Sequence, residues 1–143
     1  MVFKKVLITG GAGYVGSLLT PQLLEAGYDV TVFDILYFGD HFLPKDNPRL
    51  KVVQGDIRDR AALRNVMEGI DAVISLACIS NDASFELDER LSTSINLDAF
   101  EPMVVAAKSA GVAWPRGSIF GSRRRYLAIA SRSTSTRTVP WSR

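Results

Sequence analysis

Residues 5–16 read KVLITGGAGYVG, in which an apolar run stops at a cluster of glycines. The run is typical of a buried parallel strand, and the leucines after it recur at helical spacing. Gly11, Gly13 and Gly16 satisfy the G-x-G-x-x-G pattern between that strand and that helix. Glycine is needed there because the chain turns sharply, its backbone approaches a pyrophosphate and the helix packs closely on the sheet. The helix N-terminus adds unpaired N–H groups and a positive dipole end for the phosphates.

The rest of the first 111 residues alternates strand-like and helix-like segments, which predicts an α/β fold with a parallel sheet. Strands are expected over residues 3–8, 29–33, 50–54 and 72–77, and helices over 14–26, 60–68 and 91–110. Pro21 and Pro102 lie inside two of these helices and predict local distortions, while Gly27 and Gly111 are stop signals. We expect a Rossmann-type doubly wound sheet, truncated to the strand order 3-2-1-4, with helices on both faces.

Asp34 directly follows the second predicted strand. An acid at that place accepts hydrogen bonds from the ribose hydroxyls of an adenine dinucleotide. It would repel the 2′-phosphate of NADP, and no arginine stands directly after it to compensate. The sequence therefore favours NAD over NADP. The alternative is a glycine-rich turn that holds no cofactor.

With Thr9 before glycines 10, 13 and 16, the turn also reads T-G-x-x-G-x-x-G. This resembles the extended short-chain dehydrogenase/reductase family, which contains the NAD-dependent nucleotide-sugar epimerases and dehydratases. Residues 55–57 (GDI) resemble the family's G-D-[IVL], and residues 76–78 (LAC) resemble its H-L-A-A. Asn96 stands where the family keeps an asparagine in its long fourth helix. The resemblance covers roughly residues 3–112.

The resemblance implies a set of cofactor-binding residues. In the family the glycine turn binds the pyrophosphate, G-D-[IVL] contacts the adenine, and H-L-A-A lines the nicotinamide side. The loop that follows, residues 79–84 here, faces a nucleotide-sugar substrate. On this sequence the implied cofactor set is Gly10, Gly13, Tyr14, Val15, Gly16, Asp34, Asp56, Ile57, Leu76, Ala77, Cys78 and Asn96.

Plainer roles remain open for some of these residues. Asp56 could cap the following helix or turn, and Asn96 could satisfy backbone groups between strands. Cys78 is expected to be a small buried hydrophobe and not a nucleophile, since no histidine lies near it in sequence. His41 is expected to be solvated. We expect no metal site, because the chain has one histidine and one cysteine.

The segment after residue 111 breaks the family pattern. Family members carry a Tyr-x-x-x-Lys pair that moves a proton at the sugar hydroxyl while hydride passes to or from the nicotinamide. Here Tyr126 is followed four positions later by Ala130, and no lysine occurs after Lys108. The resemblance therefore assigns no catalytic residue to this chain, and we expect an inactive, truncated NAD-binding part. The alternative is a noncatalytic NAD-binding regulatory module.

Charge divides the chain at the same point. Residues 1–110 hold ten Lys or Arg and all fifteen Asp or Glu, a net −5, whereas residues 111–143 hold seven Arg and no acid, a net +7. We expect a NAD-binding half-domain over 1–111 and a basic Arg/Ser-rich tail over 112–143. A one-base slip turns TCG serine codons into CGT arginine codons, so residues 123–125 (RRR) suggest an out-of-frame translation. A flexible basic extension is the alternative.

Composition favours a soluble globular protein, with 47% hydrophobic and 22% charged residues. No apolar run approaches the ~20 residues of a membrane-spanning helix. The first ten residues lack a signal-peptide cleavage site, and a single cysteine suits a reducing cytoplasm. We expect no nucleic-acid or membrane partner. The family forms homodimers through helices that include the long one, but half a subunit need not assemble.

Overall fold

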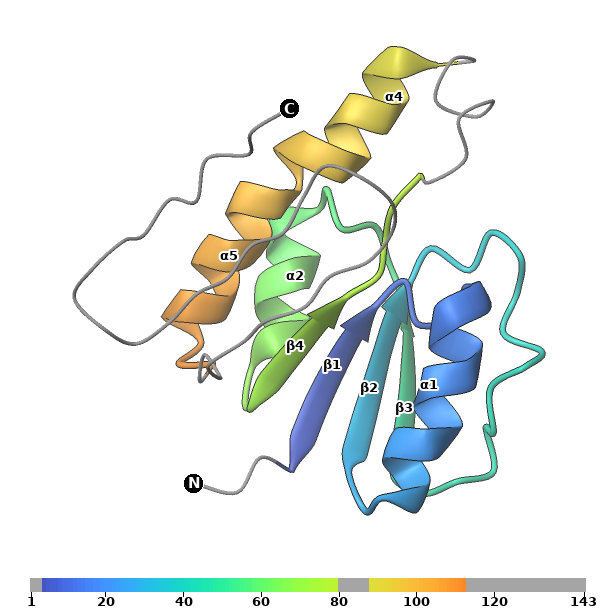
Figure 1. The fold of residues 1–143 in the computed structure, drawn as a ribbon. Helices are drawn as coiled ribbons and strands as arrows, with labels where there is room; N and C mark the ends of the chain where they lie inside the picture. Colours follow the sequence, from blue (N-terminus) through green and yellow to red (C-terminus); the bar gives the residue numbers. More distant parts are fainter. Residues whose placement is uncertain (1–3, 80–87, 113–143) are drawn as a thin grey trace, which may run out of the picture.

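The computed structural model describes residues 4–79 and 88–112. The strands and helices follow one another in the predicted order, with a loop and no helix in the described residues between the second and third strands (Figure 1). The strands are β1 Lys5–Thr9, β2 Asp29–Asp34, β3 Leu50–Gln54 and β4 Ala72–Ser75. The helices are α1 Tyr14–Glu25, α2 Arg60–Met67, α4 Glu89–Thr93, the π-helix η1 Ser94–Asp98 and α5 Phe100–Ser109.

The strands form one parallel sheet in the order β3-β2-β1-β4, which confirms the predicted strand order and fold class. Because all of them run the same way, their carboxyl ends meet at one edge of the sheet. Thr9 pairs there with Phe33 on one side and Ser75 on the other, and Asp34 pairs with Gln54. Strand order reverses between β1 and β4, and open α/β sheets bind ligands at such a point.

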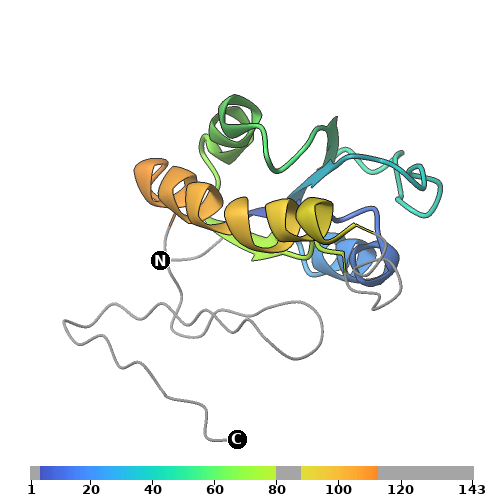
Figure 2. The same cartoon turned by 90° about the horizontal axis from the view of Figure 1, so that it is seen from above.

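Helix α1 covers one face of the sheet, and α2 and α5 cover the other (Figures 1 and 2). Successive side chains of a strand point to opposite faces, so Leu7 and Ile8 enter different clusters. The cluster on the α1 face consists of Val6, Ile8, Leu24, Val30, Val32 and Leu43. The cluster on the other face consists of Leu7, Phe33, Leu63, Met67, Ile70, Met103, Ala106, Ala107 and Val112. Strands β1 and β2 are thereby buried on both faces.

Helix α1 begins with apolar side chains that point into solvent. Tyr14, Val15 and Leu18 are exposed, whereas Leu24, one residue before its end, is buried against the sheet. The helix is continuous through Pro21. The exposed N-terminal part of α1 lies beside the glycine turn, at the carboxyl edge of the sheet (Figure 1).

The helix predicted over residues 91–110 is not one regular helix. It begins at Glu89, widens into η1 and continues as α5, so the break expected at Pro102 lies in the preceding turn. The Ala99 amide donates to the Ser94 carbonyl at 3.1 Å, which is the i→i+5 bond of a π-helix. Proline at 102 cannot donate to the Asp98 carbonyl, and its ring would crowd that oxygen in a regular α-helix. This explains why the distortion precedes the proline.

Glycines end the helices as predicted. Gly27 follows α1 with φ +94°, and Gly111 follows α5 with φ +74°. Within residues 4–79 and 88–112, no helix is both long and apolar enough to cross a membrane. The same residues contain no group of three or more His, Cys, Asp or Glu side chains that could hold a metal ion.

Candidate dinucleotide-binding site

The turn after β1 is wedged between the ends of its two neighbouring strands. The Gly10 amide donates to the Phe33 carbonyl at 2.8 Å, and Gly10 has φ +72°. A Cβ atom at residue 10 would lie 2.5 Å from the Ala77 nitrogen and 2.6 Å from the Ala77 Cα. Backbone cannot give way as the end of a side chain can. Glycine is therefore required at residue 10 by the fold itself.

Two further glycines of the turn are required by packing. A Cβ at Gly16 would collide with the backbone of Gly11, its carbonyl oxygen included. A Cβ at Gly11 would lie 2.9 Å from a Val32 methyl group and 3.2 Å from the Ile8 Cβ. These contacts bring the first turn of α1 close to the loop and the loop close to the sheet. They are the close approaches that the glycine pattern predicts.

Gly13 differs from the other glycines of the turn. A Cβ there would meet one protein atom within 4 Å, the Gly10 carbonyl oxygen at 3.3 Å. A side chain there would be tight against this one oxygen and would meet no other protein atom, so packing constrains Gly13 less than the other three glycines of the turn. A ligand that approaches the Gly13 backbone would add a second reason for glycine at this position. The open space over Gly13 thus fits the pyrophosphate of a dinucleotide.

Gly13 is also the N-cap of α1, and no described side chain caps this helix end. The Ser17 amide donates to the Gly13 carbonyl at 2.8 Å and so begins the hydrogen bonding of the helix. Amides of a first turn have no partner inside their helix, which leaves those of Tyr14, Val15 and Gly16 available to an anion. The first turn of α1 contains no acidic residue that would compete.

Asp34 ends β2 and ties the glycine turn to that strand. One carboxylate oxygen, Oδ2, accepts from the Ala12 amide at 3.0 Å, and the other, Oδ1, accepts from the Leu36 amide at 2.8 Å. A carboxylate offers about four lone-pair sites, so each oxygen keeps one for a ribose hydroxyl. Asp34 is half-buried beside the turn. It can bind a ribose without losing either backbone contact.

Asp56 lies on the neighbouring strand end, because the Gly55 amide donates to the Asp34 carbonyl at 2.9 Å. Its carboxylate is held by Arg58 through both the backbone amide and the guanidinium. The Arg58 hydrogen bonds lower the pKa of Asp56 below its ordinary value, so the group is ionised at neutral pH. Ile57, beside it, packs against the core cluster under α2.

The alternative role suggested for Asp56 is partly right. It accepts from the Arg58 amide at 2.8 Å and so stabilises the turn before α2. It does not cap the helix, because Asp59 accepts from the Ala61 and Ala62 amides at 2.9 and 3.0 Å.

Residues 76–78 continue from the end of β4 beside the glycine turn. The Leu76 amide donates to the Thr9 carbonyl at 2.8 Å, and Ala77 supplies the backbone against which Gly10 packs. The prediction that Cys78 is a buried hydrophobe is wrong, because the residue is exposed. It follows the last sheet contact of this segment, and the chain there leaves the core. His41 is exposed as predicted.

Asn96 satisfies backbone groups, as the plainer of its two suggested roles requires. Its side-chain oxygen accepts from the Ile79 amide and its side-chain nitrogen donates to the Ile79 carbonyl, both at 2.8 Å. These two bonds replace a backbone pairing for the loop after β4. Asn96 therefore positions that loop. Of the expected substrate-facing loop, residues 80–84 lie outside the described part of the chain, as do residues 113–143 of the tail.

Two residues that support the site received no role from the sequence. Thr9 is fully buried, and its hydroxyl donates to the Ser75 hydroxyl at 3.3 Å across the strands that flank the switch point. Arg58 holds Asp56 through its guanidinium, and an arginine two residues after an acid is too common in sequences to have indicated this role. The remaining predicted residues come together along the carboxyl edge of β3, β2, β1 and β4.

Comparison with known proteins supports the same interpretation. A family model described as "NAD dependent epimerase/dehydratase family" matches residues 6–138. A UDP-glucose 4-epimerase of Lactobacillus helveticus is 45% identical over 78 residues, which cover 53% of this chain and 23% of the relative. A 3 beta-hydroxysteroid dehydrogenase/Delta 5-->4-isomerase of Mycobacterium tuberculosis is 35% identical over 113 residues, which cover 76% of this chain and 29% of the relative.

A solved structure agrees in fold. DesIV, a dTDP-glucose 4,6-dehydratase of Streptomyces venezuelae with NAD bound, has a TM-score of 0.68 and 32% identity to this chain. The match covers 76% of this chain and 37% of DesIV. The chain thus spans between 23% and 37% of these three proteins. NAD, the predicted cofactor, is confirmed for the family. Because the family match takes in nearly the whole sequence, this chain belongs to the NAD dependent epimerase/dehydratase family.

Proposed function

We propose that this chain binds NAD across the carboxyl edge of its sheet. The observation that carries the proposal is the uncapped N-terminus of α1, with open space over Gly13, next to the half-occupied carboxylate of Asp34. The pyrophosphate lies against the glycine turn, where first-turn amides and the helix dipole stabilise its charge. The adenosine ribose bonds to Asp34, and the adenine lies at Asp56 and Ile57, on the next strand end.

The other end of the cofactor crosses the switch point. Residues 76–78 form the backbone wall on the nicotinamide side, and Asn96 holds the loop that continues from them. Bound NAD would supply a hydride acceptor at this end. The residues of this chain bind and orient the cofactor there.

Asp34 makes the site selective for NAD. Its charge would repel the 2′-phosphate of NADP, and Ile35 and Leu36 after it offer no compensating cation. Titration of the chain with NAD and with NADP tests this selectivity. We expect NAD to bind at least about tenfold more tightly, which corresponds to about 1.4 kcal/mol.

Asp34→Asn keeps the shape of the side chain and removes its charge, and it loses one of the two bonds that the carboxylate accepts from the Ala12 and Leu36 amides. We expect it to narrow the preference for NAD, whereas Asp46→Asn, a matched change at an exposed loop residue, leaves the preference intact. Equal affinity of the wild-type chain for both dinucleotides would contradict the assignment of Asp34. A folded chain that binds neither would contradict the function.

We further propose that the whole protein to which this site belongs acts on a nucleotide sugar. The support is the naming of two relatives as a UDP-glucose 4-epimerase and a dTDP-glucose 4,6-dehydratase. The steroid dehydrogenase relative makes a 3β-hydroxysteroid the competing class. The test compares the two substrate classes by measuring whether the NAD-loaded chain binds UDP-glucose, dTDP-glucose or a 3β-hydroxysteroid. Binding of the steroid alone would contradict the nucleotide-sugar proposal.

This chain contains no Tyr-x-x-x-Lys pair to move the proton of the family reaction. We therefore propose that it binds NAD without epimerase or dehydratase turnover. Turnover of UDP-glucose or dTDP-glucose by the purified chain would contradict this. Stoichiometric NAD binding, together with a tail that resists proteolysis and no turnover, would favour a noncatalytic regulatory module.

A further inference from the structure

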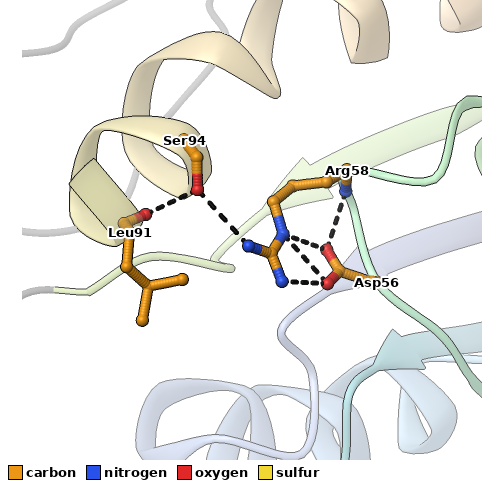
Figure 3. Close-up of polar contacts among 4 residues, drawn as sticks. All are labelled: Asp56, Arg58, Leu91 and Ser94. Carbon is orange, nitrogen blue, oxygen red and sulfur yellow. Dashed lines mark hydrogen bonds and ion pairs between the residues drawn. The ribbon is translucent and has the colours of Figure 1, made fainter.

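We propose that Arg58 is a positioning residue for recognition of the adenine base. It holds the carboxylate of Asp56 at the end of β3 and links that strand end to the π-helix η1. The proposal rests on the NAD-binding function proposed above. Figure 3 shows the network, in which the Arg58 side chain lies between Asp56 and Ser94.

The contact between Arg58 and Asp56 is a two-pronged one. The Nε atom of Arg58 lies 2.9 Å from both carboxylate oxygens, and its Nη2 atom lies 2.5 Å from Oδ2. The Arg58 backbone amide adds a bond to Oδ1 at 2.8 Å. Two parallel bonds from a planar guanidinium fix the rotation of a carboxylate as well as its position. The plane of the Asp56 carboxylate is therefore set before any ligand binds.

The pair leaves room for a ligand. Arg58 brings three N–H hydrogens to a carboxylate with about four lone-pair sites, and the Nε hydrogen is shared between the two oxygens. Because there are fewer hydrogens than sites, the carboxylate keeps the capacity for one further donor. The Asp56 side chain is 30% exposed and the Arg58 side chain 39% exposed, so solvent and ligands reach both. Asp56 can accept one more hydrogen bond, in a direction that Arg58 determines.

The base of a bound dinucleotide is expected at this carboxylate. The pyrophosphate belongs at the turn after β1 and the ribose at Asp34 on β2, so the base falls on the next strand, β3. Adenine carries an exocyclic amino group, which is a hydrogen-bond donor, and an ionised carboxylate only accepts. The remaining lone-pair site of Asp56 is thus complementary to the adenine amino group.

Arg58 also reaches a second element. Its Nη1 atom lies 3.4 Å from the Ser94 hydroxyl, which itself donates to the Leu91 carbonyl at 2.7 Å (Figure 3). Ser94 begins η1, and Asn96, two residues on, holds the backbone of Ile79 after β4. The network therefore connects the base end of the site to the loop on the nicotinamide side.

The test compares NAD with nicotinamide hypoxanthine dinucleotide, in which a carbonyl oxygen replaces the amino group. Dissociation constants of both ligands are measured for the wild-type chain and for Arg58→Ala, Arg58→Lys, Ser94→Ala and Arg60→Ala. Arg60 is the matched control, since it is an exposed arginine two residues away at the start of α2. The ratio of the two dissociation constants is the readout, because a general loss of structure weakens both ligands alike.

We expect Arg58→Ala to weaken NAD roughly tenfold and the hypoxanthine analogue far less, so that discrimination between them shrinks. Arg58→Lys keeps the positive charge but loses the two parallel N–H donors of the guanidinium, so its ratio of dissociation constants should not return to the wild-type value. Ser94→Ala should have a smaller effect in the same direction, because its contact is long. Arg60→Ala should match the wild-type chain.

Three results would overturn the inference while leaving NAD binding in place. The first is an Arg58→Ala variant with the wild-type ratio of the two dissociation constants. The second is an equal increase of both dissociation constants in that variant. The third is an Arg60→Ala variant whose ratio changes as much as that of Arg58→Ala. An Asp56 pKa, followed by carboxyl NMR, that is the same in Arg58→Ala as in the wild-type chain would also overturn it. If the folded wild-type chain binds no NAD, the proposed function fails and this inference fails with it.

Discussion

Four glycines within seven residues follow β1, and each meets a different environment. Gly10 faces backbone of the neighbouring strand end, Gly11 faces side chains of the sheet, and Gly16 faces the backbone of the turn. Gly13 faces open space apart from one carbonyl oxygen. The same residue type therefore has three structural roles and one that points to a ligand.

Substitutions at these glycines should separate folding from binding. Gly10→Ala should lower the free energy of unfolding by about 1–3 kcal/mol from its left-handed backbone alone, with more from the clash with Ala77. Gly69→Ala is the control for the backbone term, because Gly69 has φ +70° and nothing within 4 Å of a Cβ. Gly13→Ala should lose much less stability than Gly10→Ala, because its Cβ would meet only the Gly10 carbonyl oxygen at 3.3 Å, and it should bind NAD weakly. Urea unfolding and NAD titration measure the two effects, and equal stability of the Gly10 and Gly69 variants would contradict the clash.

Asp71 should make the fold sensitive to acid. Its Oδ2 atom accepts from the Lys5 amide at 2.8 Å and the Lys4 amide at 2.9 Å, and these bonds lower its pKa below the ordinary 3.8. A lowered pKa contributes stability above the unfolded value of the group, and that stability is lost as pH falls through the folded value. Asp71→Asn should lose this part of the acid dependence, measured as Tm against pH. An unchanged slope on the acid side would contradict the role of Asp71.

The sequence predicted the residues whose type is fixed by a spaced pattern. Gly10, Gly16 and Asp34 were predictable because glycines directly after a strand and an acid after the next strand form the known dinucleotide-binding pattern. The role of Arg58 was not predictable, because an exposed arginine after a turn is common. Only its distance from Asp56 in the folded chain distinguishes it. The prediction that Cys78 is buried was wrong, because its burial depends on where the chain leaves the sheet. No local sequence pattern indicates that point.

Among the elements, the π-helix η1 has the most specific task. It brings Asn96 to the loop after β4 and Ser94 to Arg58, although the two residues are only two positions apart. Residues two apart face different directions on a helix, so one short turn can serve two neighbours. Widened turns of this kind occur often at functional sites.

Removal of the Asn96 side chain should release the loop after β4. Asn96→Ala leaves the Ile79 amide and carbonyl without partners, which costs about 1–3 kcal/mol for each buried group that water does not reach. Asn65→Ala, at an exposed position of α2, is the control and should have little effect. Thermal unfolding and the amide exchange rate of Ile79 are the measurements. An Ile79 amide that exchanges at the wild-type rate in Asn96→Ala would contradict the account.

Element boundaries were predictable wherever a breaker or a polar residue ends an apolar run. The third strand, Leu50–Gln54, was predicted at both ends. The π-helix was not predictable, because the spacing of apolar residues is read over about twenty residues. One widened turn changes that average spacing too little to be noticed. The proline that accompanies it was recognised, but its effect falls in the turn before it.

For the molecule as a whole, the position of each strand decides how well it is protected. Strands β1 and β2 lie inside the sheet, whereas β4 pairs only with β1 among the described strands. Its four residues are all partly exposed. An edge strand presents unpaired backbone groups and is a site for unwanted association. The strand order that places β4 at the edge was predictable. A sequence that alternates strands with helices and has a glycine turn after its first strand can adopt only a few topologies.

Hydrogen exchange on the full chain should reflect this order. Amides of β1 and β2 should exchange most slowly, near the rate of global unfolding, and amides of β4 that point away from β1 should exchange much faster. Exchange followed residue by residue by NMR is the measurement. Protection of every β4 amide at the level of β1 would contradict the edge position and would require another segment to pair with β4.

The most direct test of the central claim is an NMR titration of the folded, labelled chain with NAD. We predict that the amides of Gly13, Tyr14, Val15 and Gly16 shift together and saturate at one NAD per chain, with the Asp34 carboxyl responding in parallel. Shifts confined to the hollow at the opposite end of the sheet, lined in part by Lys51, Asn65 and Glu68, would contradict the account. So would the absence of any shift in a chain that remains folded.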